Sequence, residues 1–407
     1  MFIYKAAVVG GGTMGSGIAQ VITYSGLPVV VKEVNAELAQ RALSGVRRIY
    51  EGRVQKGRMT QGELEAKMAL VTAATEYADL KDVDIVIEAV PEKMELKKQV
   101  FRDLDRCLPD HAILATNTSA LSISELGAVT RRPDKVIGMH FFYPAQVMKL
   151  VEVIPGLSTS EETVADTISF GESLRKLPVR VQECAGFLVN RLLMPYLNEA
   201  AFCVEEGSAN FREVDQAMAA FGFPMGPFTL VDTLGLDVCH DVVGILLEEY
   251  GNRMRPAGLW EEVYRKGRCG VKSGAGFYAY GAAPAADPAI DEILGRLRKE
   301  RASTGKAPFS PERLLLAMVN EAAFCIQEKI VSPSDIDIAL LAGIGFPQSK
   351  GGLLAYADAW GVDEVLKRLE ELHGIYGDRF FPAPLIRRMV RAGFLGKKAG
   401  RGFLEYA

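Results

Sequence analysis

The sequence predicts three domains, an α/β domain followed by two all-helical domains that resemble each other. Short apolar runs alternate with helical stretches over roughly the first 180 residues, as in a parallel sheet covered by helices. Apolar residues then recur at helical spacing, and the second half of the chain repeats itself. We expect the α/β domain over residues 1–182, the first helical domain over 183–281, a linker over 282–308 and the second helical domain over 309–407.

The composition is that of an ordinary globular protein. The 407 residues are 49% hydrophobic and 24% charged, and the net charge of −4 predicts no nucleic-acid partner. The six cysteines are far apart and form no CxxC pair, which argues against a bound metal and a disulfide framework. The sequence shows no signal peptide and no apolar stretch of transmembrane length. We therefore expect a cytoplasmic protein without membrane insertion.

A glycine motif near the N-terminus predicts a dinucleotide site. Ala6–Val9 indicates a buried strand, which leads into Gly10-Gly11-Gly12-Thr13-Met14-Gly15 and then into a helix from Ser16 to about Tyr24. The motif fits GxGxxG in its strand–turn–helix context, where glycines let a pyrophosphate approach the backbone and the helix N-terminus offers free N–H groups. These features indicate a Rossmann-type fold, with cofactor contacts from Gly10, Gly12, Thr13, Met14 and Gly15.

The next strand predicts which dinucleotide binds. Val29–Val31 leads to Glu33, whose carboxylate would accept hydrogen bonds from the adenosine ribose and repel a 2′-phosphate. NAD is therefore favoured over NADP, although Lys32 beside Glu33 weakens that preference. Two further strands, at 84–90 and 112–115, place Glu92, Lys97 and Ser119 near carboxyl strand ends, where ligands sit in such sheets. For Glu92 and Lys97 a solvated helix start is the alternative.

His140 and Glu152 predict a general base with its orienting carboxylate. His140 ends the apolar run 136–140, and Glu152 lies inside the apolar run 150–154. A carboxylate in such a strand is costly to bury without a partner, and a histidine one loop away supplies one. Neutral imidazole can take the proton of a secondary alcohol as hydride leaves the carbon, and polar groups such as Ser119 and Asn190 can bind the oxygen.

A basic segment, 41–58, has two interpretations. Its cations are Arg41, Arg47, Arg48, Arg53, Lys56 and Arg58, against the single acid Glu51. A solvated helix face is the ordinary interpretation for most of them. The sharper one is a local docking site for a phosphorylated ligand.

Several motifs carry a family resemblance over essentially the whole chain. They are Asn117-Thr118-Ser119, His140-Phe141-Phe142-Tyr143-Pro144, residues 150–154, residues 186–191, Phe223-Pro224-Met225-Gly226-Pro227 and Gly274-Ala275-Gly276-Phe277-Tyr278. In order and spacing they resemble the L-3-hydroxyacyl-CoA dehydrogenases. The resemblance implies NAD as cofactor and oxidation of a (3S)-3-hydroxyacyl-CoA to the 3-oxoacyl-CoA, in fatty-acid β-oxidation or short-chain acyl-CoA metabolism.

The same resemblance implies roles for individual residues. His140 matches the catalytic base and Glu152 its partner, while Ser119 and Asn190 match the polar residues that bind the reacting oxygens. Lys56, by ungapped count from Glu33, matches a lysine that contacts coenzyme A. The positions that match the NAD site are Glu92, Lys97, Ser119 and Lys272. Tyr143 departs from the family, which usually has a cofactor-contacting asparagine there.

The helical half is an internal repeat. Residues 198–203, 222–224, 235–237 and 274–277 recur at 320–325, 345–347, 361–363 and 400–403, so paired residues lie 122 to 126 positions apart. Glu312 stands where Asn190 stands in the first copy, so we expect the second copy to be structural. This tandem arrangement resembles that of the multifunctional fatty-acid oxidation enzymes. Single-copy members of the family pair through their helical domains, and here the second copy can take the place of the partner's domain. A monomer is therefore favoured, with a homodimer as the alternative.

Two other functions stay open from the sequence. One is an NAD-dependent dehydrogenase of a non-CoA hydroxy acid such as L-gulonate, against which the basic segment and the tandem domain argue. The other is a non-catalytic NAD-binding protein. Retention of Ser119, His140, Glu152 and Asn190 argues against that function.

Overall fold

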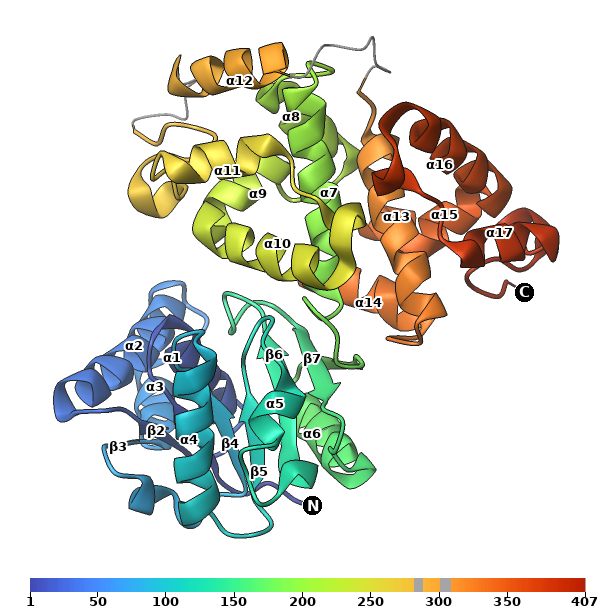
Figure 1. Ribbon diagram of the computed structural model, residues 1–407. Coiled ribbons are helices and arrows are strands. Elements are labelled where there is room, and N and C mark those ends of the chain that lie inside the picture. The colour runs from blue at the N-terminus through green and yellow to red at the C-terminus, as the bar shows by residue number, and fades with distance from the viewer. Residues whose placement is uncertain (282–287, 301–308, 407) are drawn as a thin grey trace. The chain divides into compact units, whose positions relative to one another are not determined.

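The computed structural model describes residues 1–281, 288–300 and 309–406. The chain divides into two compact units, Met1–Phe187 and Leu188–Ala407. The first is an α/β unit and the second is helical (Figure 1). The predicted fold class, a Rossmann-type domain followed by helical domains, is therefore confirmed.

The first unit is built on one eight-stranded sheet. Its strands are β1 (Ala6–Val9), β2 (Val29–Lys32), β3 (Val71–Ala74), β4 (Ile85–Glu88), β5 (Ile113–Thr116), β6 (Val136–Phe141), β7 (Leu150–Pro155) and β8 (Leu177–Arg180). They lie in the order β3-β2-β1-β4-β5-β6-β7-β8, and every neighbouring pair is parallel except β6 and β7. The strand order reverses at β1, so the glycine motif lies at the switch point where such sheets bind ligands.

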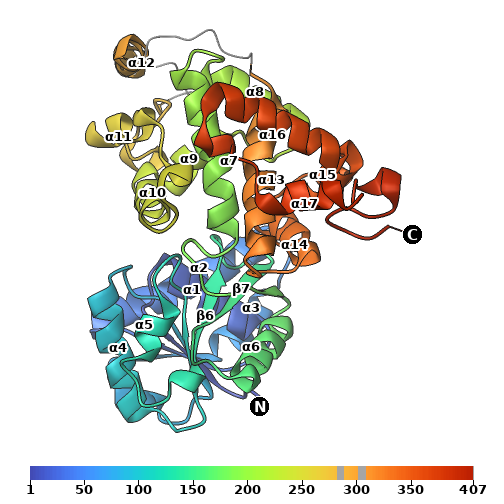
Figure 2. The same cartoon turned by 45° about the vertical axis from the view of Figure 1, so that its right-hand side comes forward.

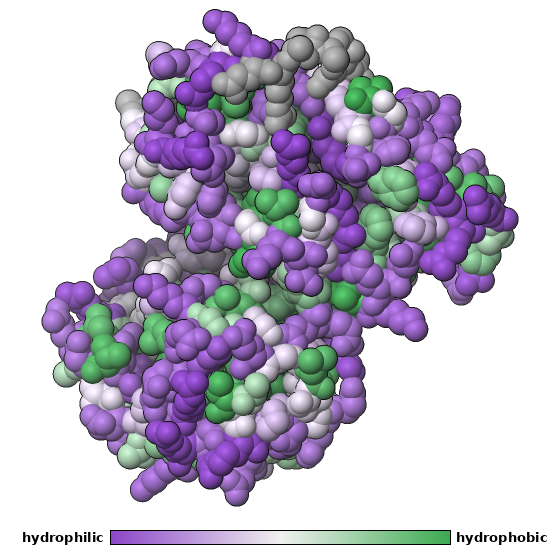
Figure 3. All heavy atoms as spheres, in the orientation of Figure 1, coloured by the Kyte–Doolittle hydropathy of each residue, from purple (hydrophilic) through white to green (hydrophobic). Residues whose placement is uncertain are grey.

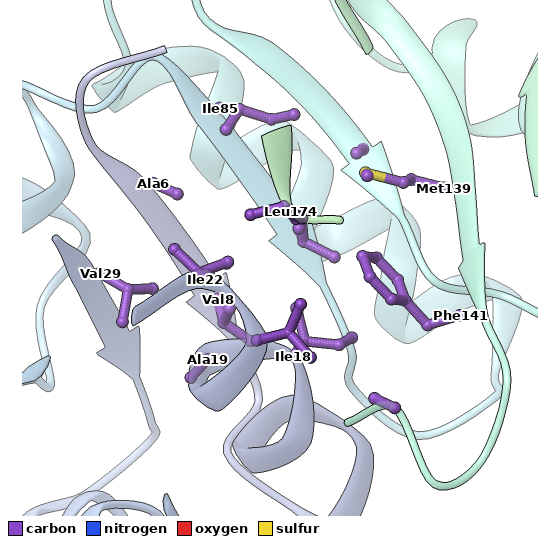
Figure 4. Close-up of a cluster of buried hydrophobic side chains, with 14 of the residues drawn as sticks. Ala6, Val8, Ile18, Ala19, Ile22, Val29, Ile85, Met139, Phe141 and Leu174 are labelled. Carbon is purple, nitrogen blue, oxygen red and sulfur yellow. The ribbon is translucent and has the colours of Figure 1, made fainter. Parts of the chain in front are cut away.

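Helices cover both faces of this sheet (Figures 1 and 2). They are α1 (Thr13–Tyr24), α2 (Ala36–Gln55), α3 (Gln61–Met68), α4 (Met94–Cys107), α5 (Ile123–Gly127) and α6 (Glu161–Ser173). The core of one face joins the sheet to α1, α2 and α6, and Figure 4 shows Val8 of β1 beside Ile18 and Ile22 of α1. These side chains are fully buried, as expected for strands with helices on both sides.

The second unit repeats one helical pattern twice. The first copy contains α7 (Val189–Glu205), α8 (Phe211–Phe221), α9 (Pro227–Leu234), α10 (Leu236–Tyr250) and α11 (Gly258–Arg265). The second contains α13 (Pro311–Gln327), α14 (Pro333–Gly343), α15 (Leu353–Trp360), α16 (Val362–Tyr376) and α17 (Pro384–Arg391). The long helices α7 and α13 lie side by side (Figures 1 and 2). Each copy ends in a small turn closed by paired β-bridges, so the repeat seen in the sequence is a structural repeat.

The segment that we expected as a linker, 282–308, contains a helix, α12 (Pro288–Glu300). Ile290, Ile293, Leu294 and Leu297 are buried at helical spacing, and α12 packs against α7 and α11. The small residues and prolines that begin the segment hid this apolar stripe from the sequence prediction. Residues 282–287 and 301–308 of the predicted linker lie outside the described residues.

Hydrophilic side chains dominate the visible surface of both units (Figure 3). Among the described residues, no helix combines the length and the apolar character that crossing a membrane requires. Within those same ranges, no group of histidine, cysteine and acidic side chains is arranged to hold a metal ion. Cys203, Cys239 and Cys325 are buried.

Candidate active site

The glycine loop after β1 has room for a ligand at the N-terminus of α1. Gly10 has a φ of +95°, and a Cβ on Gly15 would lie 1.8 Å from the Gly10 carbonyl oxygen, so the protein's own packing requires both glycines. A Cβ on Gly12 would meet nothing within 4 Å. Gly12 is the N-cap of α1, and no side chain caps that end. An open, uncapped helix start beside Thr13 and Met14 fits a dinucleotide pyrophosphate.

Glu33 closes one side of this loop. It follows β2, and its Oε1 accepts a hydrogen bond of 2.6 Å from the Gly11 N–H. Lys32, which weakened the preference for NAD, is buried with its ammonium 4.1 Å from the centroid of the Tyr77 ring. Burial raises the pKa of Tyr77 to about 12, so this ring stays neutral. A lysine held in this way is poorly placed to bind a 2′-phosphate.

A buried charge cluster lies at the ends of β4 and β5. The Lys97 ammonium donates to both oxygens of Glu88, at 2.8 and 3.0 Å, and lies 3.2 Å from Glu92. Lys97 and Glu88 are 1% and 0% exposed, and Thr116 donates a further hydrogen bond to Glu88. The solvated helix start is therefore wrong for Lys97, whereas Glu92 keeps 41% of its side chain exposed.

Glu92 in turn holds the Ser119 loop. Its Oε1 accepts hydrogen bonds from Thr118 Oγ1, from the Ser119 N–H (2.8 Å) and from Ser119 Oγ (3.1 Å). Partial burial acts to raise the pKa of Glu92, but the Lys97 ammonium and these hydrogen bonds outweigh it and lower the pKa. Glu92 is thus a carboxylate at neutral pH that organises the residues after β5.

His140 and Glu152 form the pair that the strand pattern predicted. They lie directly opposite each other on the antiparallel strands β6 and β7, and His140 Nδ1 is 2.7 Å from Glu152 Oε2. The two residues are 7% and 0% exposed. The rings of Phe142 and Phe187 lie 4.5 and 5.9 Å from the imidazole, between centroids. With Nδ1 bound to a carboxylate, Nε2 is the nitrogen left for proton transfer.

The sheet brings these groups to one edge. The residues at or after the carboxyl ends of β1, β2, β4, β5 and β6 are Gly10, Glu33, Glu92, Ser119 and His140. The Asn117 side chain ties two of these ends together, because its Oδ1 accepts a 2.8 Å hydrogen bond from the Phe141 N–H. Tyr143, the departure from the family pattern, is 62% exposed in the loop that follows.

Two of the six cations of the basic segment pair with an acid, and the other four form no ion pair within the described residues. Arg41 pairs with Glu37 and Arg47 with Glu65, as expected for a solvated helix face. Arg53 has no acidic partner among the described residues, and it donates a 2.9 Å hydrogen bond to the Tyr24 hydroxyl instead. Within the described part of the chain, Arg48, Lys56 and Arg58 form no ion pair, and Lys56 is exposed just after α2.

Two predicted site residues lie in the helical unit. Asn190 is in the first turn of α7. Lys272 pairs with Asp237 at 2.6 Å, and the second copy repeats this pair as Lys398 with Asp363, also at 2.6 Å. Because the second copy has no nucleotide domain, the repeated pair favours a structural role for Lys272. The repeat of Gly235-Leu236-Asp237 at 361–363 already contained this signal.

Sequence reasoning missed Glu88 and Asn117 as organisers of the site. Glu88 ends an apolar strand, so the argument that singled out Glu152 applies to it equally. For Asn117 the sequence held no comparable signal, since its contact crosses from one strand end to the next.

Family models match nearly the whole chain. Residues 5–184 match the NAD binding domain of 3-hydroxyacyl-CoA dehydrogenase, and residues 186–280 and 309–406 each match its C-terminal domain. The chain belongs to the 3-hydroxyacyl-CoA dehydrogenase family. The predicted family and its NAD-dependent oxidoreductase class are thereby confirmed.

Individual relatives agree with this assignment. The fatty acid oxidation complex subunit alpha of Shewanella amazonensis is 42% identical over 394 residues, which are 96% of this chain and 56% of the relative. The chain thus spans about half the length of the curated relatives that it matches. Crystal structures of 3-hydroxybutyryl-CoA dehydrogenases from Escherichia coli (29% identical, TM-score 0.86) and Ralstonia eutropha (39%, TM-score 0.67) cover 97% and 69% of this chain, and each is matched over 100% of its own length.

Proposed function

We propose that this chain catalyses the reversible, NAD-dependent oxidation of (3S)-3-hydroxyacyl-CoA to 3-oxoacyl-CoA, in fatty-acid β-oxidation or short-chain acyl-CoA metabolism. The observation that carries the proposal is the His140–Glu152 pair at the same sheet edge as the glycine loop. A base beside a dinucleotide site is what alcohol oxidation requires. The family membership supplies the acyl-CoA class of substrate.

His140 is the base in this mechanism. Its Nε2 accepts the proton of the substrate's 3-hydroxyl as the C3–H electron pair departs as hydride, and the C–O bond becomes a carbonyl. Bound NAD supplies the acceptor for that hydride. Glu152 holds the Nδ1–H and stabilises the imidazolium that forms, which then returns the proton in the reverse direction.

Ser119 and Asn190 are the proposed ligands of the substrate oxygens. Ser119 donates its hydroxyl proton to Glu92, so donation to a substrate oxygen requires this hydrogen bond to be exchanged. Glu92 therefore controls the direction in which Ser119 points. Asn190 offers an amide N–H as a second donor, and the second copy has Glu312 at that position, which cannot donate when ionised.

Coenzyme A is proposed to bind at Lys56 with help from Arg48 and Arg58. These cations have no ion pair to lose within the described residues, so a phosphate would meet them without breaking an existing contact. A non-CoA hydroxy acid would not need them. Replacing Lys56 by an acidic residue should therefore impair turnover of a CoA substrate and leave turnover of a non-CoA hydroxy acid unchanged.

The central experiment measures NADH oxidation with acetoacetyl-CoA and NAD reduction with 3-hydroxybutyryl-CoA and with L-gulonate. We expect turnover of the CoA substrates alone, loss of at least about a hundredfold in kcat for His140→Gln, and a raised KM for acetoacetyl-CoA in Lys56→Glu. The matched control is His111→Gln, which changes an exposed histidine of the same unit. Turnover of L-gulonate alone, or full activity of His140→Gln, would refute the proposal.

We also propose that the chain is a monomer, because its two helical copies make an internal two-fold interface. Arg191 of the first copy donates to Glu321 (2.8 Å) and Glu328 (2.7 Å) of the second. The equivalent arginine of the second copy, Arg313, makes the same contacts with Glu199 (2.6 Å) and Glu206 (2.7 Å) of the first. Such reciprocity is the mark of an isologous dimer contact.

A second arginine on each side completes this interface. Arg253 contacts Glu321, and its counterpart Arg379 contacts Glu199. Arg191 and Arg313 are 0% and 2% exposed, so the contacts leave no surface at these positions for another chain. Sedimentation or light scattering at micromolar concentration should give the mass of one chain. A stable dimer that Arg191→Glu dissociates would contradict this proposal.

A further inference from the structure

Lys176 is a buried cation without an acidic partner in the described residues. It lies between α6 and β8, is 8% exposed, and donates hydrogen bonds to the carbonyl oxygens of Ala145 (2.5 Å) and Met148 (2.7 Å). Burial alone lowers its pKa to about 8. The preceding residue, Arg175, lies over the Tyr24 ring, and Arg180 at the end of β8 pairs with Glu161 of α6.

The two acceptors belong to a turn in the loop between β6 and β7. The N–H groups of Val147 and Met148 both donate to the Pro144 carbonyl oxygen, at 2.9 and 3.0 Å. Within this turn Ala145 is buried, at 2% exposed, whereas Val147 is 65% exposed. Buried carbonyl groups need donors, and the Lys176 ammonium supplies them to both ends of this turn.

The turn rests on the helix that begins at the glycine loop. A Cβ on Gly17 of α1 would lie 3.2 Å from the Ala145 Cβ and 3.3 Å from Oε1 of Gln146, so a side chain at Gly17 would press on this turn. The same loop connects the strands of His140 and Glu152. Lys176 therefore acts on a turn that packs against the dinucleotide helix and lies in the loop between the strands of His140 and Glu152.

We propose that Lys176 is a positioning residue for the dinucleotide, holding the 144–148 turn against α1 so that the glycine loop and the His140 strand keep their relative placement. A methionine would fill the same space without the cost of burying a charge, so the ammonium is explained by its hydrogen bonds to the turn. The inference rests on the proposed function only for the identity of the ligand, NAD.

The test compares Lys176→Met, Lys176→Arg and Lys149→Met, the last an exposed lysine of the same loop. NADH affinity is measured by fluorescence titration without acyl substrate, and kcat is measured separately at saturating NAD. We expect Lys176→Met to weaken NADH binding about tenfold, Lys176→Arg to recover part of it, and Lys149→Met to bind as wild type does. Gly17→Ala is a second arm, which displaces the turn without removing a charge and should also weaken binding.

Each outcome decides the proposal. Wild-type NADH affinity in folded Lys176→Met, even with a lowered melting temperature, would show a purely structural role and overturn it. If that variant does not fold, wild-type affinity in Gly17→Ala overturns it instead. NADH binding needs no acyl-CoA, so the two proposals can fail separately. If Lys176→Met weakens NADH binding but the wild type turns over no CoA substrate, the proposed function is refuted and this inference stands.

Discussion

The sharpest prediction concerns the carboxylate behind the base. Glu152→Gln keeps the size of the side chain but removes the charge that faces His140 Nδ1 at 2.7 Å. The two side chains are 1% and 9% exposed, so solvent screens this contact little. A hydrogen bond to a charged group contributes about 1.5–3 kcal/mol, and each 1.36 kcal/mol corresponds to about tenfold in rate. The expected loss in kcat is therefore about 10-fold to 150-fold.

The loss should fall on kcat and leave the KM for acyl-CoA nearly unchanged, because the imidazolium exists only as the reaction proceeds. The assay is NAD reduction with 3-hydroxybutyryl-CoA, with near-ultraviolet circular dichroism to confirm the fold. Glu161→Gln, an exposed carboxylate paired with Arg180 in the same unit, serves as the control. A folded Glu152→Gln variant with kcat within about threefold of wild type would refute the assignment of Glu152 as orienting partner.

Four further predictions follow from other parts of the molecule. Glu33→Gln should raise the KM for NAD about tenfold and reduce the ratio of kcat/KM for NAD to kcat/KM for NADP. An unchanged ratio would contradict the proposed hydrogen bonds between Glu33 and the adenosine ribose. Arg313→Met should lower the free energy of unfolding of the helical unit by about 3–5 kcal/mol in urea titration, because it leaves Arg379 as the single arginine facing two glutamates with buried side chains, Glu199 and Glu206. A loss below about 1 kcal/mol would argue against a stabilising interface. Because burial lowers the pKa of Lys176 to about 8, below its unfolded value, the unfolded chain binds more protons between about pH 8 and 10.5. Stability should therefore rise with pH in that window relative to Lys176→Met, and a flat difference between the two would contradict the shift. Lys272→Met and Lys398→Met should each cost less than about 1 kcal/mol of stability and leave NADH affinity unchanged, whereas weaker binding in the Lys272 variant alone would return that residue to the cofactor site.

Much of the site was predictable because it follows from local rules. The glycine motif needs only a strand before it and a helix after it, and both are written in neighbouring residues. The pairing of His140 with Glu152 followed from two consecutive apolar strands joined by a short loop, since such strands pair antiparallel and bring matched positions together. The repeat was likewise visible as sequence identity at a nearly constant offset.

The burial and the partners of other residues could not be predicted, because they depend on segments that are distant in the sequence. Lys97 was expected to be either a cofactor residue or a solvated lysine, and it is buried against Glu88. Lys272 matches a cofactor position by resemblance, and in the structure it pairs with Asp237, a pair that the second copy repeats as Lys398 with Asp363. The helix α12 was masked by the composition of the segment around it.

The sequence by itself determined the family, the cofactor class and the pairing of His140 with Glu152, because each depends on a motif or on neighbouring strands. Only the tertiary structure decided which charged side chains are buried and which groups they form hydrogen bonds or ion pairs with. Arg175 and Lys176 are adjacent in the chain, yet one is exposed and the other is 8% exposed beneath the turn between β6 and β7. The physical reason is that burial, and with it the cost and the use of a charge, is set by segments distant in the sequence.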